Sequence, residues 1–390
     1  MKILYVVSDL ASGGAQIALR RFLEVLDREK FSPYVISLSG GGEQADYIRS
    51  LGIDVQAFDM RCFFSMAPSF LKFLRAVKEI NPDIIHGWMY HGNAAAILAG
   101  SVCPKAGILW SIRCSDFDLS KYGLMTKIAF FINRKFSSSP AKIIYNSNAG
   151  KKYHEENGFC QEKSIVIQNG VDTEYFIPAP EKKNELRSKY GIATGVRLIG
   201  MASRYDPMKD FDTLFGAFAA VRAASASAVG AVNPDTALIL CGKGIDDSNT
   251  ALSAMVQKYG VKDGVIFAGH IKEMNEFYPL LDVFVLSSKS EGFPNVLAEA
   301  SACGVPALST RCGDAEEIIG SEKTVPAGDT ALMAEKILKI LKLGREEKAI
   351  ETAKAVCLMR EKFNAVSEAK KFERVYGEIE NGENKNGQSI

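Results

Sequence analysis

Residues 283–300 read VFVLSSKSEGFPNVLAEA and contain the parts of a strand–loop–helix unit. Val283–Leu286 is a short, wholly apolar run, which is typical of a strand buried in a parallel sheet. A polar loop follows, and Pro294 suits the first turn of a helix that should run to about Cys303 and stop near Gly304. The stretch therefore predicts a strand whose carboxyl end leads through a loop into a helix N-terminus.

The same rhythm extends along the chain in both directions. Short apolar runs alternate with helical patterns such as Ala15–Leu26, Pro68–Ile80 and Asn93–Ala99, which predicts right-handed βαβ units and parallel sheets. The expected strands are Lys2–Val7, Tyr34–Leu38, Val55–Phe58, Ile84–His86, Ile108–Ile112, Ile143–Tyr145 and Ile165–Ile167 in the first half, and Leu198–Ala202, Ala237–Cys241, Val265–Ala268, Val283–Leu286 and Pro306–Ser309 in the second.

Loop-like segments divide the chain. A stretch near Asn169–Asn184 separates two halves of similar architecture, so we expect an α/β fold of two Rossmann-like, doubly wound parallel-sheet domains, 1–168 and 169–365. Ala223–Asp235 is expected to be a small-residue loop at a helix end, and the tail 380–390 is expected to be disordered.

Composition excludes several classes of protein. The 390 residues are 47% hydrophobic and 24% charged with a net charge of +1, so nothing global points to nucleic acid. Eight scattered cysteines without a C-x-x-C pair, and only four histidines, argue against a zinc site. Asp9 interrupts any N-terminal apolar region, and no run of about 18 apolar residues occurs. We therefore expect a cytoplasmic protein.

Two glycines follow the first expected strand, in the segment SDLASGGAQ at 8–16. Gly13 and Gly14 would let the backbone approach a bound group, and the N–H groups of the following helix N-terminus would face an anion. The spacing is not G-x-G-x-x-G, which argues against a nicotinamide-dependent dehydrogenase.

Two carboxylates frame the helix N-terminus after Val283–Leu286. Glu291 falls in the loop and Glu299 inside the helix, where they can hold sugar hydroxyls while backbone N–H groups meet phosphate. Taken alone, such a pair also fits a solvated helix face.

At 291–300, EGFPNVLAEA matches the E-x7-E signature of the family 4 retaining glycosyltransferases, and the chain resembles that family over roughly residues 1–375. The resemblance implies a GT-B fold, with an acceptor-binding domain 1–168 facing a nucleotide-sugar-binding domain 169–365 across a cleft, and a helix 366–379 that crosses back. Further family landmarks appear in order: the Gly13-Gly14 loop, NGVD at 169–172 with Phe176, Arg204 and Lys209, Gly242–Gly244, Gly269-His270, Asp282, Ser287-Ser288 and Gly304–Pro306.

The resemblance also implies residue roles in the donor site. Arg204 and Lys209 would grip the donor diphosphate and stabilise charge on the leaving group. Glu299 would accept from the ribose hydroxyls, and Glu291 would lie near the 3- and 4-hydroxyls of the transferred sugar. The remaining expected donor contacts are Gly13, Gly14 and Gly242, the backbone of His270 and Ile271 beside the base, and the loop residues Gly292, Phe293, Pro294, Asn295 and Val296, whose backbone N–H groups would cap phosphate or sugar.

The first half departs from the family pattern at one histidine. After the strand ending in His86, the common H-x-H arrangement would put a second histidine at position 88, where this chain has Trp88. We expect His91 to contact the donor sugar as a catalytic residue, with His86 as the second choice. Arg113 stands where relatives often carry a histidine and is expected to contact an acceptor phosphate.

The function implied is retaining, metal-independent transfer of a sugar from a nucleotide-sugar donor, UDP first and GDP second, to a glycan or lipid-linked acceptor in polysaccharide or lipopolysaccharide biosynthesis. No cofactor is expected, and no metal, because the D-x-D pairs Asp116–Asp118 and Asp210–Asp212 precede helical patterns, where aspartate caps a helix. A nucleotide-sugar epimerase of the same architecture and a catalytically silent sugar-nucleotide-binding subunit remain alternatives.

One helical stretch has two interpretations. Lys121–Phe136 reads KYGLMTKIAFFINRKF and combines four basic residues with an apolar stripe. We expect a surface helix that packs this stripe inward. The alternative is contact with an anionic membrane, at its inner face, or with a lipid-linked acceptor.

Overall fold

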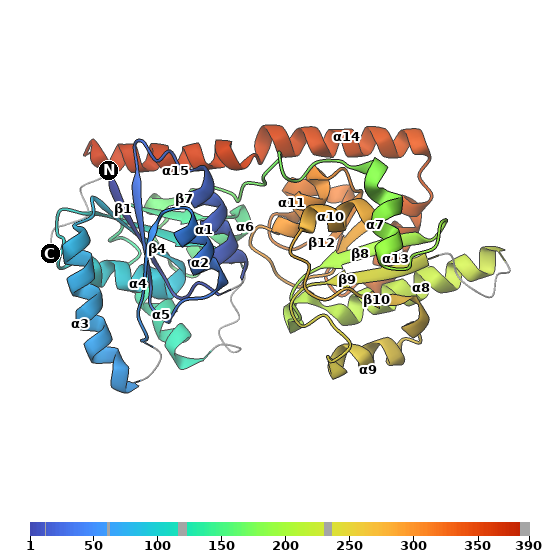
Figure 1. Ribbon diagram of the computed structural model, residues 1–390, viewed down its shortest axis with the longest axis horizontal. Helices are drawn as coiled ribbons and strands as arrows, with labels where there is room; N and C mark the ends of the chain where they lie inside the picture. The colour runs from blue at the N-terminus through green and yellow to red at the C-terminus, as the bar shows by residue number, and fades with distance from the viewer. Residues whose placement is uncertain (12, 61–62, 116–122, 230–235, 383–390) are drawn as a thin grey trace. The chain divides into compact units, whose positions relative to one another are not determined.

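The computed structural model describes residues 1–11, 13–60, 63–115, 123–229 and 236–382 (Figure 1). The chain forms two compact units, 1–170 together with Ala365–Ile390, and Val171–Asn364. These limits lie within two residues of the expected ones, and the expected tail 380–390 falls outside the described residues from 383 onward. Each unit is built on a parallel sheet, so the predicted pair of doubly wound α/β domains is confirmed.

The sheet of the first unit has the strand order β3-β2-β1-β4-β5-β6-β7, and all its neighbouring strands are parallel. The chain moves outward from β1 in one direction and then returns to place β4 on the other side of β1. This topological switch point lies between β1 and β4, where ligands bind in open α/β sheets. The strands are β1 (Lys2–Val7), β2 (Ser32–Ser37), β3 (Asp54–Ala57), β4 (Ile84–Trp88), β5 (Gly107–Ile112), β6 (Lys142–Tyr145) and β7 (Ser164–Val166).

Helices cover both faces of this sheet because alternate strand residues are apolar on both sides. In β1, Ile3 and Tyr5 belong to one core cluster, whereas Leu4 belongs to another on the opposite face. Helices α1, α2 and α15 supply buried residues to the first cluster, and α3 and α4 supply them to the second. The helices are α1 (Gly14–Val25), α2 (Glu43–Ser50), α3 (Phe63–Ile80), α4 (Met89–Gly100), α5 (Leu124–Lys135), α6 (Asn148–Glu156) and α15 (Ala365–Glu380).

The C-terminal helix α15 is part of the first unit's core. Its Phe372 and Tyr376 pack with Phe22 of α1, at ring-centroid distances of 4.9 and 6.5 Å. The chain passes between the units twice, and the two passages are paired, since the Val171 N–H donates to the Phe363 carbonyl at 2.7 Å. At this point a Cβ on Gly170 would lie 2.3 Å from the Ala365 Cα, so only glycine allows the approach.

The second unit repeats the plan with the strand order β10-β9-β8-β11-β12-β13, again all parallel. Its switch point lies between β8 and β11, which places the segments after these two strands at one edge of the sheet. The strands are β8 (Arg197–Ala202), β9 (Thr236–Cys241), β10 (Val265–Phe267), β11 (Val283–Leu286), β12 (Ala307–Thr310) and β13 (Thr324–Val325). The helices are α7 (Lys183–Lys189), α8 (Phe211–Val229), α9 (Thr250–Lys258), α10 (Met274–Phe277), α11 (Asn295–Ala302), α12 (Ala315–Ile319), α13 (Thr330–Leu341) and α14 (Arg345–Lys362).

Two sequence-based expectations are wrong. The segment Ala223–Asp235 is helical as far as Val229, where α8 ends, because its alanines favour the helix; residues 230–235 lie outside the described part of the chain. The apolar stripe of 121–136 does not pack inward. In α5, Ala129, Phe130 and Asn133 are buried, whereas the apolar side chains on the opposite side are exposed. The sequence predicts the amphipathic pattern of this helix correctly, but not which side of it packs against the sheet.

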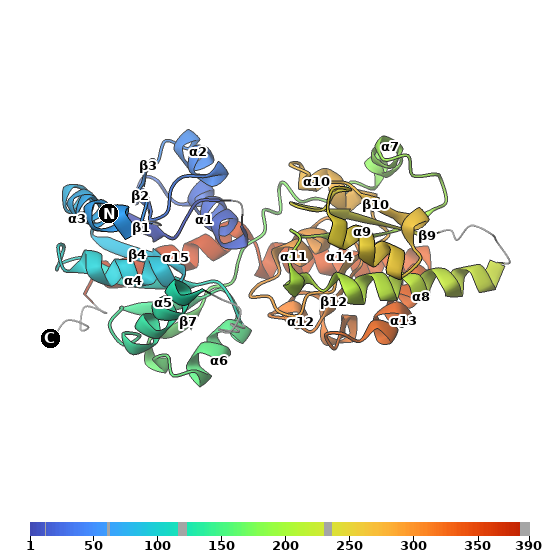
Figure 2. The same ribbon diagram turned by 90° about the horizontal axis from the view of Figure 1, so that it is seen from below.

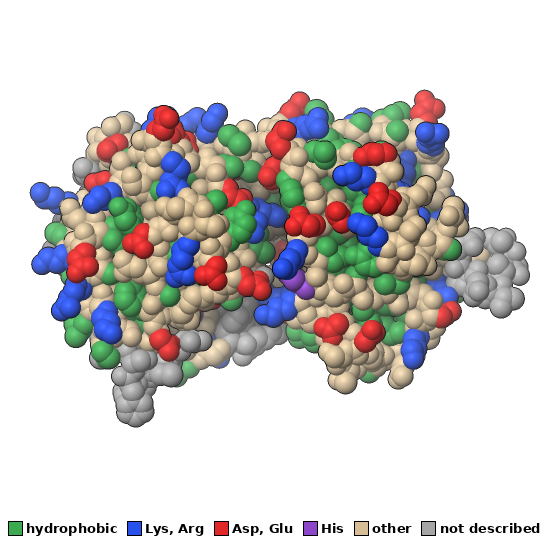
Figure 3. Space-filling view, in the orientation of Figure 1, with side chains coloured by type: hydrophobic (Ala, Val, Ile, Leu, Met, Phe, Trp, Pro, Cys, Tyr) green, Lys and Arg blue, Asp and Glu red, His purple; other side chains and the backbone are tan. Residues whose placement is uncertain are grey.

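The surface carries charges of both signs. On the face shown in Figure 3, Lys and Arg side chains are interspersed with Asp and Glu, in keeping with the net charge of +1. None of the helices in the described part of the chain is long and apolar enough to span a membrane.

Candidate functional site

The topology of the second unit brings two sequence-distant loops together at the β8–β11 switch point. Arg204 and Lys209 follow β8, and Glu291 follows β11. The two loops are joined directly, since the Ser287 hydroxyl donates to the Lys209 carbonyl at 2.7 Å and the Lys289 N–H donates to the Met208 carbonyl at 2.8 Å. Residues about 80 positions apart therefore share one edge of the sheet.

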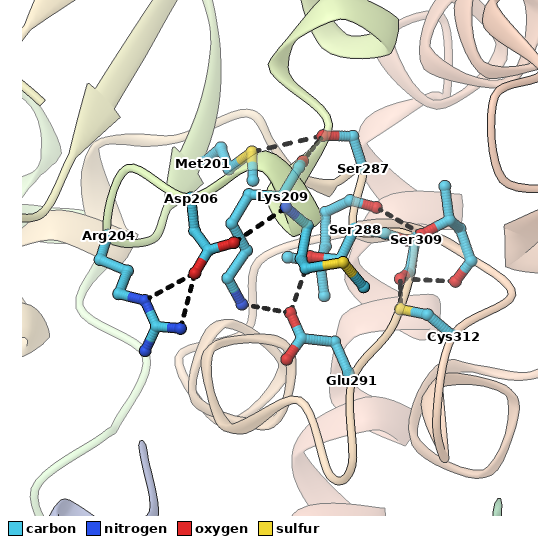
Figure 4. A network of polar contacts seen from close by, with 12 residues as sticks. Met201, Arg204, Asp206, Lys209, Ser287, Ser288, Glu291, Ser309 and Cys312 are labelled. Carbon is cyan, nitrogen blue, oxygen red and sulfur yellow. Dashed lines mark hydrogen bonds and ion pairs between the residues drawn. The ribbon is translucent and has the colours of Figure 1, made fainter. Parts of the chain in front are cut away.

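Lys209 and Glu291 form the centre of this edge (Figure 4). The Lys209 Nζ lies 2.5 Å from the Glu291 Oε1, and the Ser288 hydroxyl donates to the same oxygen at 2.7 Å. The two charged side chains are only 17% and 16% exposed, so their attraction is screened less than that of a surface pair. Both charges are held at fixed positions beside the strand ends.

Arg204 lies beside this pair and has a carboxylate partner of its own, Asp206 (Figure 4). The Arg204 Nη2 and Nε donate to the Asp206 Oδ2 at 2.7 and 3.1 Å. Burial opposes the ionised form of Asp206, but the Met208 N–H, the guanidinium and the Lys209 ammonium together hold its pKa below the ordinary value. The Arg204 side chain is 56% exposed, so this cation is accessible to an anion from solvent.

The second carboxylate, Glu299, is buried within α11. Its side chain is held by Tyr278, whose hydroxyl donates to Oε2 at 2.5 Å. Burial and the Glu299 charge raise the pKa of Tyr278 well above its ordinary value, so the phenol keeps its proton and acts as the donor. Glu299 is therefore aimed by a fixed partner rather than free to rotate.

Glycine allows close backbone approaches around these groups. At Gly242, which follows β9 with φ +137°, a Cβ would lie 2.0 Å from the Ser203 carbonyl oxygen. At Gly313, with φ +53°, a Cβ would lie 2.0 Å from the Gly292 carbonyl oxygen. A side chain at position 242 would displace the segment that carries Arg204, and one at position 313 would displace the segment that carries Glu291.

The other residues expected to bind the donor in this unit lie at the same strand ends. Gly292, Phe293 and Pro294 lead into α11, whose first turn contains Asn295 and Val296. Phe293 is buried against Phe363, with ring centroids 5.4 Å apart, which fixes the loop to α14. His270 and Ile271 follow β10 beyond Gly269, and His270 is exposed.

In the first unit, the expected residues gather at the carboxyl ends of β1, β4 and β5. Gly13 is the N-cap of α1, and Gly14 is its first residue. His91 lies in the first turn of α4, directly after Met89, which has an unusual positive φ of 65°. Burial lowers the pKa of His91, with the Asp9 charge opposing this, so its imidazole is neutral at neutral pH.

His86 is a structural residue. It is fully buried, with Nδ1 3.0 Å from the Tyr376 hydroxyl and Nε2 2.9 Å from the Ser111 hydroxyl. Burial lowers its pKa to about 3, with the Arg113 charge acting in the same direction. Both ring nitrogens are engaged within the fold, which excludes the second-choice role in donor contact.

Arg113 follows β5 and stacks over the Trp88 ring, with its Cζ 4.6 Å from the ring centroid. Its Nη2 donates to the Asn169 side chain, but its Nε and Nη1 are buried and find no hydrogen-bond partner among the described residues. Burial lowers its pKa to about 9, and Tyr376 and Glu368 oppose this effect. A guanidinium whose N–H groups are not all hydrogen-bonded is suited to bind an anionic group.

Comparisons with known proteins identify the family. Residues 182–356 match the family model described as glycosyl transferases group 1, and residues 12–175 match the model described as glycosyltransferase family 4. The chain belongs to the family 4 glycosyltransferases.

Relatives of this glycosyltransferase share limited identity with it. A GDP-mannose-dependent alpha-(1-6)-phosphatidylinositol monomannoside mannosyltransferase from Mycolicibacterium smegmatis is 32% identical over 40% of each chain, so the match spans less than half of that relative. The GDP-mannose-dependent monoacylated alpha-(1-6)-phosphatidylinositol monomannoside mannosyltransferase of Corynebacterium glutamicum is 29% identical over 87% of this chain and 88% of its own. The crystal structure of HepE from Anabaena with UDP and glucose has a TM-score of 0.82 at 21% identity, covering 97% and 99% of the two chains, which shows the GT-B fold.

Of the two D-x-D pairs of the glycosyltransferase, only the second lies within the described residues. Asp116 and Asp118 lie outside the described residues. Asp210 accepts from the Thr213 hydroxyl at 2.8 Å at the start of α8, and Asp212 pairs with Lys258 at 2.7 Å, so the two carboxylates serve separate partners. Over the described ranges, no three His, Cys, Asp or Glu side chains are grouped to hold a metal ion.

Sequence reasoning missed Tyr278 and Asp206, which hold the glycosyltransferase's Glu299 and Arg204. Tyr278 stands in the apolar segment FYPLLD and reads as an ordinary core residue. Asp206 stands two residues after Arg204, and that spacing is a signal that could have identified it.

Proposed function

We propose that this glycosyltransferase moves a sugar, with retention at the anomeric carbon and without a metal ion, from a nucleoside diphosphate sugar to a glycan or lipid-linked acceptor. The observation that carries the proposal is the pairing of Lys209 with Glu291, at 2.5 Å, beside Arg204 at the β8–β11 switch point. Cations beside a carboxylate match the chemistry of a donor, which has an anionic diphosphate next to a neutral, hydroxyl-bearing sugar.

Each charged group has a use in this reaction. Arg204 and Lys209 would bind the diphosphate and stabilise the negative charge that grows on it as the anomeric carbon–oxygen bond breaks. Lys209 would then exchange its contact with Glu291 for one with phosphate, which leaves the carboxylate to accept from sugar hydroxyls. Glu299, held by Tyr278, would accept from the ribose hydroxyls.

Retention is explained by attack from the face on which the phosphate leaves. The acceptor oxygen forms the new bond to the anomeric carbon, the phosphate takes the bonding electrons, and the acceptor's proton passes to the leaving phosphate. The alternative is a covalent route, which requires a carboxylate behind the anomeric carbon. Trapping a glycosyl–enzyme adduct on any carboxylate would overturn the front-face route.

The donor proposed for the first test is GDP-mannose. Two sequence relatives are named as GDP-mannose-dependent mannosyltransferases, one of them matching over 87% of this chain. The HepE structure with UDP, at 21% identity, supports the fold rather than the base, so UDP-glucose is the second donor to test.

The acceptor proposed is anionic. Arg113 lies over the Trp88 ring at the carboxyl edge of the first sheet, and two nitrogens of its buried guanidinium have no hydrogen-bond partner among the described residues. A phosphate or carboxylate on the acceptor would accept a charge-assisted hydrogen bond from one of these nitrogens.

The test is nucleotide release from a panel of GDP-, UDP- and ADP-sugars, with and without EDTA. We expect slow release from one donor, unaffected by EDTA and lost in Glu291→Gln, but kept in the control Glu351→Gln, whose carboxylate pairs with Lys323. Release abolished by EDTA would contradict the metal-free route. An isomerised donor in place of released nucleotide would identify an epimerase.

A further inference from the structure

The exposed apolar side chains of the described residues are concentrated on one short helix. Twelve large hydrophobic residues are exposed in this part of the chain, and six of them fall within 13 residues of α5 and its C-cap. They are Leu124 (71% exposed), Met125 (57%), Ile128 (42%), Phe131 (52%), Ile132 (36%) and Phe136 (37%). Single exposed apolar residues are normal, but a contiguous set of this kind marks an interaction surface.

These side chains form one face of the helix. At about 100° per residue, Leu124, Ile128 and Phe131 fall on one line, with Met125 and Ile132 beside it. The opposite side, with Ala129, Phe130 and Asn133, is buried, where the helix packs against α4 and the sheet (Figures 1 and 2). Packing within the unit therefore already occupies one side of α5 and leaves the apolar face uncovered.

The charges around this face have one sign. Between Leu124 and Phe136 the sequence carries Lys127, Arg134 and Lys135 and no acidic residue. Lys135 lies within the apolar face, and Lys127 and Arg134 lie on its flank. A second copy of the chain on this face would bring like charges together, whereas an anionic surface would be attracted.

We infer that α5 docks the protein on a membrane of anionic phospholipid, with its apolar face in the headgroup region and its basic side chains against lipid phosphates. A helix that lies in the interface needs this combination of an exposed apolar face and adjacent Lys and Arg.

The position of α5 in the fold places the proposed membrane-binding surface near the expected acceptor residues. As the crossover helix from β5 to β6, it begins toward the carboxyl edge of the sheet, where Arg113 and His91 lie. Its most exposed residue, Leu124, stands at that end. An acceptor anchored in the same membrane would therefore be presented to the edge that carries Arg113.

The test is flotation of the full-length protein with vesicles of phosphatidylcholine alone or mixed with phosphatidylglycerol. We expect binding to the mixed vesicles at low salt, weaker binding at high salt, and little binding to the neutral ones. Ile128→Ser with Phe131→Ser should lower the partition coefficient about tenfold or more, and Lys127→Gln with Lys135→Gln about fivefold per charge. The control Ile350→Ser, at a 53% exposed site on α14, should bind like the unchanged protein.

Three results would overturn the inference. The first is that the unchanged protein does not bind mixed vesicles at low salt. The second is that the Ile128→Ser, Phe131→Ser variant binds these vesicles as strongly as the unchanged protein. The third is that the protein does not bind vesicles but forms a concentration-dependent dimer, seen by sedimentation, which this variant abolishes. Circular dichroism and thermal unfolding would verify that each variant is folded. Vesicle binding is measured without any sugar donor, so its failure is distinguishable from failure of the proposed transfer reaction.

Discussion

Replacing Tyr278 with phenylalanine isolates one hydrogen bond of the proposed donor site. The Tyr278 hydroxyl donates to the Glu299 Oε2 at 2.5 Å, and its ring packs with Phe176 and Phe284 at centroid distances of 5.9 and 5.7 Å. Because phenylalanine keeps the ring, the variant creates no large cavity. The change therefore removes one hydrogen bond that orients the Glu299 carboxylate and leaves the packing of the ring in place.

The expected loss of stability follows from the burial of Tyr278 and Glu299. A hydrogen bond to a charged group contributes about 1.5–3 kcal/mol, and here both partners are buried, at 0% and 5% exposed. For a unit of this size, each kcal/mol shifts the Tm by about 2–4 °C, so we expect a fall of about 3–12 °C. If Glu299 accepts from the ribose, loss of its orientation should also weaken nucleotide binding about tenfold, equivalent to about 1.4 kcal/mol.

The assay combines scanning calorimetry with titration of a nucleoside diphosphate and its 2′,3′-dideoxy form. Tyr278→Phe should weaken binding of the first and leave binding of the second unchanged, because the dideoxy form has no ribose hydroxyls for Glu299. Tyr190→Phe, at a tyrosine packed against the same core, is the matched control. A lower Tm with unchanged binding of both ligands would refute the role of this bond in nucleotide recognition.

Three further predictions concern catalysis, acid stability and folding. Lys209→Met should lower kcat/KM for the donor about 100-fold, measured by nucleotide release, because a charge-stabilising donor to the leaving group is lost. Burial lowers the pKa of His154 to about 4, so between this value and the ordinary pKa the unfolded chain binds a proton that the folded chain excludes. This residue should therefore lower the free energy of unfolding by about 2–3 kcal/mol as the pH drops from 7 to 4.5. Urea unfolding of His154→Gln should show a free energy of unfolding that depends less on pH. Asp282→Asn should cost about 2–4 kcal/mol in urea unfolding, because Asp282 accepts from Lys183 at 2.6 Å and Arg187 at 2.7 Å; an unchanged midpoint would contradict this.

Much of the fold could be predicted from the sequence because buried parallel strands are continuous apolar runs. The expected strand Val283–Leu286 agrees with β11, and Lys2–Val7 agrees with β1. Alternation with helical patterns then identified the βαβ units. The exposed face of α5 could not be predicted in the same way, because the amphipathic pattern is the same whether its apolar side packs inward or faces solvent.

The candidate site was predicted as a set of residues rather than as an arrangement. The motif at 291–300 singled out Glu291 and Glu299, but a single sequence gives no information on pairs such as Lys209 with Glu291, which only the strand order brings together. Likewise, His86 and His91 are similar in sequence context. Only burial and hydrogen bonding to Tyr376 and Ser111 separate the structural histidine from the accessible one.

The central claim is that the β8–β11 edge binds a nucleoside diphosphate through its cations, without a metal. The most direct measurement is calorimetric titration of GDP and UDP, with EDTA present, into the unchanged protein, Lys209→Met and the control Lys323→Met, whose lysine pairs with Glu351 just before β13 begins. The account predicts that one nucleotide binds to the unchanged protein and to the control, and at least tenfold more weakly to Lys209→Met. Equal binding to all three proteins, or binding that disappears in EDTA, would contradict it.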